Sequence, residues 1–366
     1  MKCLICEGLM SKMLNLPRLP LTEMYEPFSK TFIEGRGCED QAFMFCQRCN
    51  HGSLENIISP ERLYGSGYLT QTSKSAGATQ AVKNFVEFID KNCNLSGIDT
   101  VIDIGANDYT MLDCYSGKSL VGIDPKANRA GSIPKFIENA DLSHLKKAKK
   151  LIVSSHTIEH LSDPEMMISK ISEILNQDDI FALQFPSLEL LVRDCRIDQI
   201  HHQHVSYFSE RSISALLKRH GITITHKSFD DSHWGALMLI CRSGIGMVKG
   251  DPIPKERIET AIGYFEEEMM SIRIPKGTIA LGASLMLPIL SYWAPELGNI
   301  ECISDDDKTK EGLRYVNFNK QIVNGYAIKG KDVVITALGS KSAYRSLTKR
   351  ALDVGASNVI LPMRTL

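Results

Sequence analysis

The pattern of apolar and polar positions predicts alternating helices and strands through the middle of the chain. Residues 76–91 carry apolar positions at helical spacing, and the apolar run TVIDI at residues 100–104 then leads into a glycine turn. Further strand ends are predicted in the stretches SLVGID, KFIENADL, KLIVSSHTIEHL and DIFALQFPS. This order predicts a doubly wound α/β sheet, a Rossmann-like fold with its ligand crevice at the carboxyl ends of the strands.

The same pattern returns near the C-terminus. Glycines and two prolines punctuate residues 245–255, which we interpret as a linker, and a helix is predicted over residues 255–272. The stretches TIALGAS, ECISDDD, KDVVITALGS and ASNVILPM then predict a second Rossmann-like sheet. Gly282 and Ser284 would face a phosphate there, unless this part is a scaffold with an empty crevice.

Length and charge limit the possible organisation and partners. A chain of 366 residues exceeds one ordinary core, so two or three domains are expected, and we predict domain bounds of 1–70, 71–245 and 255–366. A net charge of -1 argues against nucleic acid or anionic lipid as partner. The N-terminus lacks the apolar region of a secretory signal, and no apolar run is long enough to span a bilayer. We therefore expect a cytoplasmic protein with a small-molecule substrate, and the sequence does not predict its oligomeric state.

Four of the ten cysteines form two CxxC pairs, Cys3 with Cys6 and Cys46 with Cys49. Two such pairs can place four thiolates tetrahedrally around one Zn²⁺, and four thiolates leave no open position, so a structural zinc site is predicted. The alternative is a set of reduced, buried cysteines or a redox pair. Cys38 lies between the pairs and is not expected to be a ligand.

The glycine turn after residues 100–104 is the candidate cofactor site. A glycine turn that leads into a helix presents backbone N–H groups to a ligand, and an acid about 20 residues further on can accept hydrogen bonds from ribose hydroxyls. An acid and a histidine in HTIEHLSDP fit a class I S-adenosylmethionine-dependent methyltransferase better than a nicotinamide enzyme. The candidate cofactor contacts are Asp103, Gly105, Asn107, Asp124, Pro125 and Asp141.

The stretch HHQHVSYFS at residues 201–209 places three histidines within four positions. Histidine suits general base catalysis because its pKa lies near neutrality, although many histidines beside strands are only hydrogen-bonded scaffold. A metal site is the third reading. It ranks last because the sequence shows no carboxylate or cysteine at ligand spacing.

Several motifs together resemble the three-domain sugar C-methyltransferases of deoxysugar pathways, which act on nucleotide-linked keto sugars. The two CxxC pairs resemble the zinc head of that family, GYLTQTS resembles its YxxxS segment, and VIDIGANDY resembles VLEIGxNDG. HHQHVSYFS resembles YHEHxSYFS, and GASLMLPIL with ISDDDKTKEG resembles the C-terminal Rossmann-like half. The resemblance covers nearly the whole chain.

The resemblance implies S-adenosylmethionine as cofactor and methylation of a carbon next to a keto group through an enolate. His204 matches the general base of the family, while His160 and Tyr68 match two further active-site side chains. His201 and Gln203 stand where the family has tyrosine and glutamate, so a carboxylate that orients the base or stabilises its protonated form is missing.

Two further departures leave alternatives open. Tyr109 replaces the glycine that closes the cofactor turn, and Trp234 replaces one glycine of a pair that ends in Gly235. These changes favour an altered acceptor, as in an O- or N-methyltransferase, or a nucleotide-sugar binding protein that has lost methyl transfer.

Overall fold

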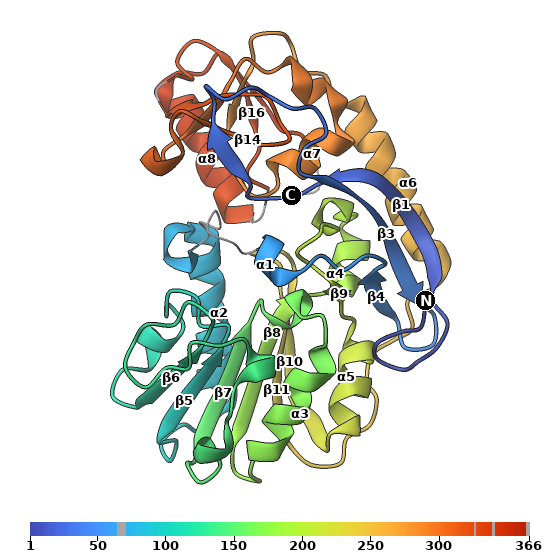
Figure 1. The fold of residues 1–366 in the computed structure, drawn as a ribbon, viewed down its shortest axis with the longest axis vertical. Helices are drawn as coiled ribbons and strands as arrows, with labels where there is room; N and C mark the ends of the chain where they lie inside the picture. The colour runs from blue at the N-terminus through green and yellow to red at the C-terminus, as the bar shows by residue number, and fades with distance from the viewer. Residues whose placement is uncertain (64–70, 326, 339–340, 364–366) are drawn as a thin grey trace.

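The computed structural model describes residues 1–63, 71–325, 327–338 and 341–363. Figure 1 shows a lower half built on the central part of the chain, an upper half built on the C-terminal part, and N-terminal strands that run along one side of both. Two large sheets dominate these halves, and a smaller sheet links them.

The lower half contains a six-stranded sheet. Its strands in spatial order are β10 (Ile222–Asp230), β11 (Ala236–Ser243), β8 (Ile180–Pro186), β7 (Lys150–Ser155), β5 (Thr100–Ile104) and β6 (Ser119–Ile123). The strands from β8 to β6 are parallel, whereas β11 and β10 form an antiparallel hairpin at one edge. β5 and β8 are buried along their whole length, as expected for strands covered on both faces. The predicted Rossmann-like α/β fold is confirmed.

The apolar pattern predicted the first helix of this half. α2 (Ala76–Asn92) begins at Ser75, whose hydroxyl oxygen accepts a hydrogen bond from the N–H of Ala78, and its apolar face is buried on the sheet. The other helices of this half are α3 (Pro164–Ile174), α4 (Leu188–Arg193) and α5 (Glu210–Arg219).

One predicted strand end is wrong. The stretch KFIENADL forms a short 3₁₀ helix at Ile137–Asn139 and no strand. Its buried residues Ile137, Ala140 and Leu142 do not alternate, and they join the core on the side of α3, so the segment covers the sheet and does not extend it.

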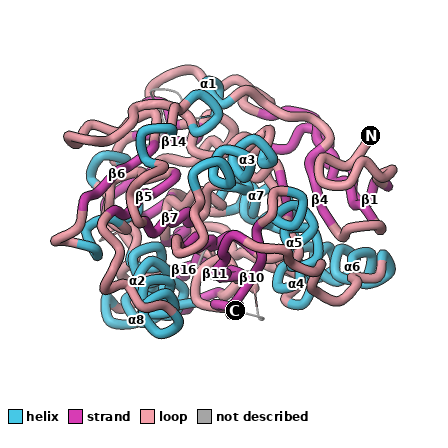
Figure 2. Tube along the Cα trace, turned by 90° about the horizontal axis from the view of Figure 1, so that it is seen from below, coloured by secondary structure: helices cyan, strands magenta, loops and turns pink. Residues whose placement is uncertain are grey.

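The upper half contains a parallel five-stranded sheet, which agrees with the second Rossmann-like pattern. Its order is β15 (Ile322–Asn324), β13 (Ile303–Asp305), β12 (Ile279–Leu281), β16 (Asp332–Ile335) and β17 (Asn358–Ile360). The helices of this half are α6 (Lys255–Ser271), α7 (Leu287–Trp293) and α8 (Lys341–Val354). α8 packs against α2 of the lower half, and the two lie side by side in Figure 2.

The N-terminal strands connect the two halves. The linking sheet has the order β1 (Ser11–Pro20), β3 (Cys38–Cys46), β4 (His51–Leu54) and β9 (Ser206–Tyr207), so its last strand comes from the segment directly after His204. β2 (Tyr25–Pro27) pairs with β14 (Leu313–Tyr315) of the upper half, where Arg314 donates two hydrogen bonds to Glu26. The domain boundaries proposed from the sequence remain predictions.

The remaining elements are short. They are α1 (Pro60–Leu63) and 3₁₀ helices at Thr72–Lys74, Leu112–Tyr115, Ser143–Leu145, Ile158–His160, Ile197–Gln199, Pro295–Asn299 and Lys308–Lys310. Among the described residues, no helix is both long enough and apolar enough to cross a bilayer.

Candidate active site

A cavity of about 370 Å³ opens between the two halves. Its walls come from the glycine turn after β5, from the segment after β7, from the loop before β9 and from the turn after β12. Of the site residues predicted from sequence, this cavity is lined by Asp103, Gly105, Asn107, His160, His201, Gln203 and His204. Tyr68 lies outside the described residues.

The glycine turn after β5 has an unusual backbone. Gly105 has a φ of 81°, and a Cβ there would lie 2.0 Å from the hydroxyl oxygen of Thr157, so both conformation and space require glycine. Asn107 and Tyr109 also have positive φ values, of 45° and 66°. Every second residue from Gly105 to Tyr109 thus has a positive φ, and these residues form a wide turn at the carboxyl end of β5. An open α/β sheet binds its ligand at this end of its strands.

Asp103 lies below this turn and faces the cavity. The side chain is 3% exposed, and its burial, with the nearby charge of Asp124, raises the pKa of Asp103 to about 7. Its charge therefore changes near neutral pH.

Three predicted cofactor contacts lie outside the cavity. Asp124 accepts hydrogen bonds from the backbone N–H groups of Asn107 and Lys126, and so holds the glycine turn against the end of β6. Pro125 is exposed. Asp141 is also exposed, and it accepts a hydrogen bond from the N–H of Ser143 in the segment that forms no strand.

Tyr109 turns away from the cavity. Its hydroxyl oxygen accepts hydrogen bonds from the N–H groups of Asn128 at 2.6 Å and Arg129 at 3.0 Å, and the Arg129 guanidinium lies 4.2 Å from the ring centre. The ring contacts Gly122 of β6, where an added Cβ would come within 2.8 Å of it. Tyr109 therefore fixes the loop after β6 and leaves the histidine side of the cavity open.

Three predicted histidines meet in the cavity. The ring centre of His204 lies 4.2 Å from that of His201 and 5.0 Å from that of His160. His160 reaches this place from the end of β7, and its Nδ1 lies 2.8 Å from the carbonyl oxygen of Gln203. Trp234 lies beside the cluster, 6.0 Å from His204 between ring centres.

Burial keeps the imidazoles of His201 and His204 uncharged. Desolvation, with smaller contributions from neighbouring histidines, lowers the pKa of His204 well below its usual value and that of His201 to about 3. Neither ring nitrogen of His201 has a hydrogen-bond partner among the described residues, and Nδ1 of His204 has none there either. Uncharged, unpaired imidazole nitrogens are available for a ligand.

The other two residues of the motif differ in role. His202 turns into the linking sheet, where its Nε2 lies 3.0 Å from the carbonyl oxygen of Leu19. The side-chain nitrogen of Gln203 is buried at the cavity without a partner among the described residues.

Sequence reasoning missed three titratable side chains of the cavity, His156, Glu159 and His233. The Glu159 carboxylate is 1% exposed and lies 3.4 Å from Nδ1 of His156 and 3.9 Å from Nε2 of His160. The sequence around the histidine motif holds no carboxylate at ligand spacing, but the fold places the Glu159 carboxylate next to the cluster. Glu159 directly precedes His160, but 45 positions separate it from His204, and only the fold brings them together.

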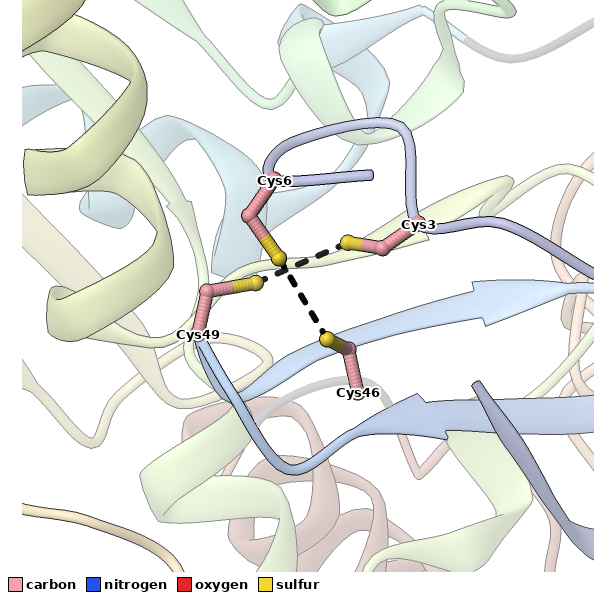
Figure 3. Close-up of side chains that lie close together, drawn as sticks. All are labelled: Cys3, Cys6, Cys46 and Cys49. Atoms are coloured by element: carbon pink, nitrogen blue, oxygen red, sulfur yellow. Dashed lines mark hydrogen bonds between the residues drawn. The ribbon is translucent and has the colours of Figure 1, made fainter. Parts of the chain in front are cut away.

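The four predicted zinc ligands converge at the other end of the linking sheet. Figure 3 shows Cys3 and Cys6 facing Cys46 and Cys49, with Sγ separations of 3.5 Å for Cys3–Cys49 and for Cys6–Cys46. A tetrahedral site with Zn–S bonds of about 2.3 Å requires sulfur separations of about 3.8 Å, so the cluster fits zinc after small shifts. Hydrogen bonding from Cys49 lowers the pKa of Cys3 to about 5.

The upper half forms one wall of the cavity. Gly282, with a φ of 106°, opens the turn after β12, and Ser284, Leu285 and Met286 of this turn line the cavity. The Ser284 hydroxyl donates a hydrogen bond to the carbonyl oxygen of Thr336, which holds the turn against β16.

Comparison with known proteins agrees with this geometry. Residues 73–227 match the family described as a methyltransferase domain. The C-methyltransferase NovU of Streptomyces niveus is 26% identical over 207 residues, which cover 53% of this chain and 49% of that protein. The chain thus spans about half the length of this curated relative.

Solved methyltransferases are similar only at a low level. The magnesium protoporphyrin IX methyltransferase ChlM of Synechocystis PCC 6803, with bound S-adenosylhomocysteine, is 18% identical with a TM-score of 0.36 and covers 50% of this chain and 92% of its own. The N-methyltransferase NodS of Bradyrhizobium japonicum WM9 is 10% identical with a TM-score of 0.38, and it covers 50% of this chain and 95% of its own. Similarities at this level say nothing about the substrate.

The family match begins just before α2 and ends within β10, so it contains the glycine turn, the segment after β7 and the histidine motif. The predicted enzyme class is confirmed for this part of the chain. By this match, residues 73–227 form a methyltransferase domain.

Proposed function

We propose that the protein transfers a methyl group from S-adenosylmethionine to a carbon next to the keto group of a nucleotide-linked sugar. The observation that carries this proposal is the position of His204, which lines the same cavity as the glycine turn Gly105–Asn107. The curated C-methyltransferase relative supports transfer to carbon, and the similarity of the motifs to sugar C-methyltransferases supports the acceptor class.

His204 is the proposed base. A carbon next to a ketone becomes nucleophilic only after it loses a proton, and an uncharged imidazole can accept that proton. Glu159 lies in the same cluster, with ligand atoms of Glu159, His160 and His204 within 4.8 Å of one another. Its carboxylate can stabilise the protonated base, which is the role that Gln203 cannot perform.

Donors for the enolate oxygen come from the same walls. The buried side-chain amide of Gln203 and the imidazole of His201 both line the cavity. The amide nitrogen of Gln203 and both ring nitrogens of His201 have no hydrogen-bond partner among the described residues. A negative charge that develops on the substrate oxygen is stabilised by such preorganised donors in a site that excludes water.

The cofactor is proposed to lie along the turn after β5. S-adenosylmethionine supplies a methyl group on a positively charged sulfur. Asp103 provides a carboxylate near that charge, and Asn107 provides polar groups at the cavity wall. Asp124, at the end of β6, is placed next to this turn for a ribose.

The nucleotide of the substrate is proposed to occupy the upper half. Ser284 and its neighbours bring the turn after β12 into the cavity, so a molecule that contacts His204 can extend into the second Rossmann-like crevice. Parallel strands of both sheets that direct their carboxyl ends to one cavity suit a substrate with a sugar at one end and a nucleotide at the other.

The cysteine cluster is proposed to bind a structural zinc ion. Its second CxxC pair leads directly into β4, and β4 pairs with β9 through Gly52 with Tyr207 and Ser53 with Ser206. The ion would therefore fix the strand that follows His204 and orient the proposed base from a distance.

Isotope exchange tests the proposal. With a panel of keto-sugar nucleotides deuterated next to the ketone, the wild-type protein should release deuterium and form a new carbon–carbon bond with labelled S-adenosylmethionine. His204→Gln should abolish both, while calorimetry shows cofactor affinity nearly unchanged. His202→Gln is the matched control, because His202 faces the linking sheet and not the cavity.

The outcome also separates the alternatives. Methyl transfer without loss of carbon-bound deuterium would assign the enzyme to O- or N-methylation. Failure to bind S-adenosylmethionine would leave a nucleotide-sugar binding protein, the reading that Tyr109 favoured.

A further inference from the structure

The buried carboxylate of Glu159 requires a partner of positive charge. It is 1% exposed, and neither oxygen accepts a hydrogen bond from any described residue. Burying a carboxylate without a hydrogen bond or a cation is strongly unfavourable. The groups nearest to it are imidazole nitrogens, at 3.4 Å on His156 and at 3.9 Å on His160.

Glu159 and two of the neighbouring imidazoles lie close enough together to hold a metal ion. One ligand atom each from Glu159, His160 and His204 lies within 4.8 Å of the other two. Ligands of a tetrahedral ion with bonds of about 2.0–2.1 Å lie roughly 3.4 Å apart, so a shift of about 1 Å would close this triangle.

The tautomer of His160 points to the same conclusion. Its Nδ1 lies 2.8 Å from the carbonyl oxygen of Gln203, which can only accept a hydrogen bond, so Nδ1 carries the proton. The lone pair is then on Nε2, the nitrogen that faces Glu159. A histidine ligand characteristically donates its other ring N–H to a carbonyl or carboxylate in this way.

We propose that Glu159, His160 and His204 form a second cation site, which takes a divalent transition-metal ion such as Zn²⁺ and leaves its fourth position open to the cavity. Two imidazoles and one carboxylate favour Zn²⁺, Co²⁺ or Ni²⁺ over Mg²⁺ and Ca²⁺, which prefer oxygen ligands alone. The site is separate from the cysteine cluster, which has four ligands of its own.

Occupancy of this site has a consequence that rests on the proposed function. A nitrogen lone pair of His204 that binds a metal cannot take a proton from the substrate. The bound ion therefore inhibits proton abstraction, and removing it restores the base. The geometry thus makes methyl transfer sensitive to free transition-metal ions.

Metal counting tests the binding part directly. After equilibrium dialysis against micromolar Zn²⁺, the wild-type protein should hold two equivalents per chain, and a mild chelator should remove one of them. Glu159→Gln should hold one equivalent, with affinity for the second lowered by about 100-fold or more, beyond the roughly 10–100-fold typical of losing an outer partner. Glu210→Gln is the matched control, since Glu210 is also buried but pairs with Lys227 outside the cavity.

Co²⁺ provides a second readout. Added to protein whose cysteine cluster holds zinc, it should produce visible absorption without a sulfur charge-transfer band, and His160→Gln should weaken that absorption. A single equivalent of metal in the wild-type protein, or two in Glu159→Gln, would overturn the proposal. The wild-type count decides the matter even if Glu159→Gln does not fold.

The inhibitory part is measured by deuterium release with and without added Zn²⁺. Release should fall as the second equivalent binds and return after mild chelation. Two equivalents of metal without any methyl transfer would refute the proposed function but support the second metal site. Methyl transfer by a protein that binds only one equivalent would support the proposed function and refute the second metal site. Full release at two equivalents would show that the ion does not engage the base.

Discussion

Nδ1 of His160 lies 2.8 Å from the carbonyl oxygen of Gln203, so one hydrogen bond joins the end of β7 to the loop that carries His204. His160 and Gln203 are 43 positions apart, and this bond fixes one imidazole of the cavity relative to another. We infer that His160 positions the proposed base as well as facing the substrate.

Removing the His160 side chain should therefore loosen the loop. For His160→Ala we expect kcat to fall by about 10²-fold, as is typical when a reacting group is misplaced by about 1 Å. Hydrogen exchange at residues 201–204 should become faster. His226→Ala, which alters an exposed histidine of β10, is the control. Unchanged exchange in His160→Ala would show that the bond does not hold the loop.

Asp103 should make cofactor binding depend on pH. Its pKa is raised to about 7 by burial, so its carboxylate becomes charged as the pH rises through neutrality. Affinity for positively charged S-adenosylmethionine should therefore increase from pH 6 to pH 8, while affinity for S-adenosylhomocysteine, which lacks the sulfonium charge, should change less. Calorimetry with both ligands measures this difference, and Asp103→Asn should remove it.

The same residue should affect stability in the opposite direction. Between the ordinary carboxyl pKa near 4 and about 7, the folded protein retains a proton that the unfolded chain has released, so the free energy of unfolding decreases as the pH rises through this window. Denaturation of Asp103→Asn should lack this decrease. A parallel loss in both proteins would assign the effect to another group.

The cysteine cluster should stabilise the strand beside the proposed base. Cys46→Ser removes one of four ligands, and we expect the melting temperature to fall by about 5–10 °C with release of the bound zinc. Faster hydrogen exchange should appear in β4 and β9, because these strands pair directly. Cys38→Ser changes a cysteine outside the cluster and should leave zinc content and melting temperature unchanged.

Tyr109 should stabilise the loop after β6. Tyr109→Phe removes the oxygen that accepts two backbone hydrogen bonds, and leaving these donors unpaired should lower the free energy of unfolding by about 1–3 kcal/mol. Exchange of the Asn128 and Arg129 amides should become faster. Tyr115→Phe is the matched control, because the buried Tyr115 hydroxyl has no partner among the described residues and its loss should cost little. Equal effects of both changes would contradict the role of the Tyr109 hydroxyl.

Local features of the sequence predicted much of the fold. The apolar periodicity predicted α2 and α6 almost to the residue, and the strand before Gly105 appears as β5. The stretch around Asp141 was misread because a few apolar residues without clear alternation cannot distinguish a strand from a short covering turn. That misreading also explains why Asp141 was proposed as a cofactor contact although it lies on the surface.

Tyr109 shows where knowledge of residue type was insufficient. From sequence, a tyrosine in place of the glycine that closes the cofactor turn favours an altered acceptor or a protein that has lost methyl transfer. In the structure its positive φ directs the ring over Gly122 to the loop after β6, away from the cavity. Side-chain direction depends on the backbone of the turn and on the contacts available to the ring.

By itself, the sequence determined the two Rossmann-like patterns, the paired CxxC motifs and the glycine turn, because these depend on residues a few positions apart. Only the tertiary structure decided that Glu159 stands beside His204, that His202 faces away and that Ser284 closes the same cavity. These relations join residues 45 or more positions apart or depend on which face of a short loop is buried. They arise when the sheets pack together, because packing is specified by the whole core and not by any local stretch of chain.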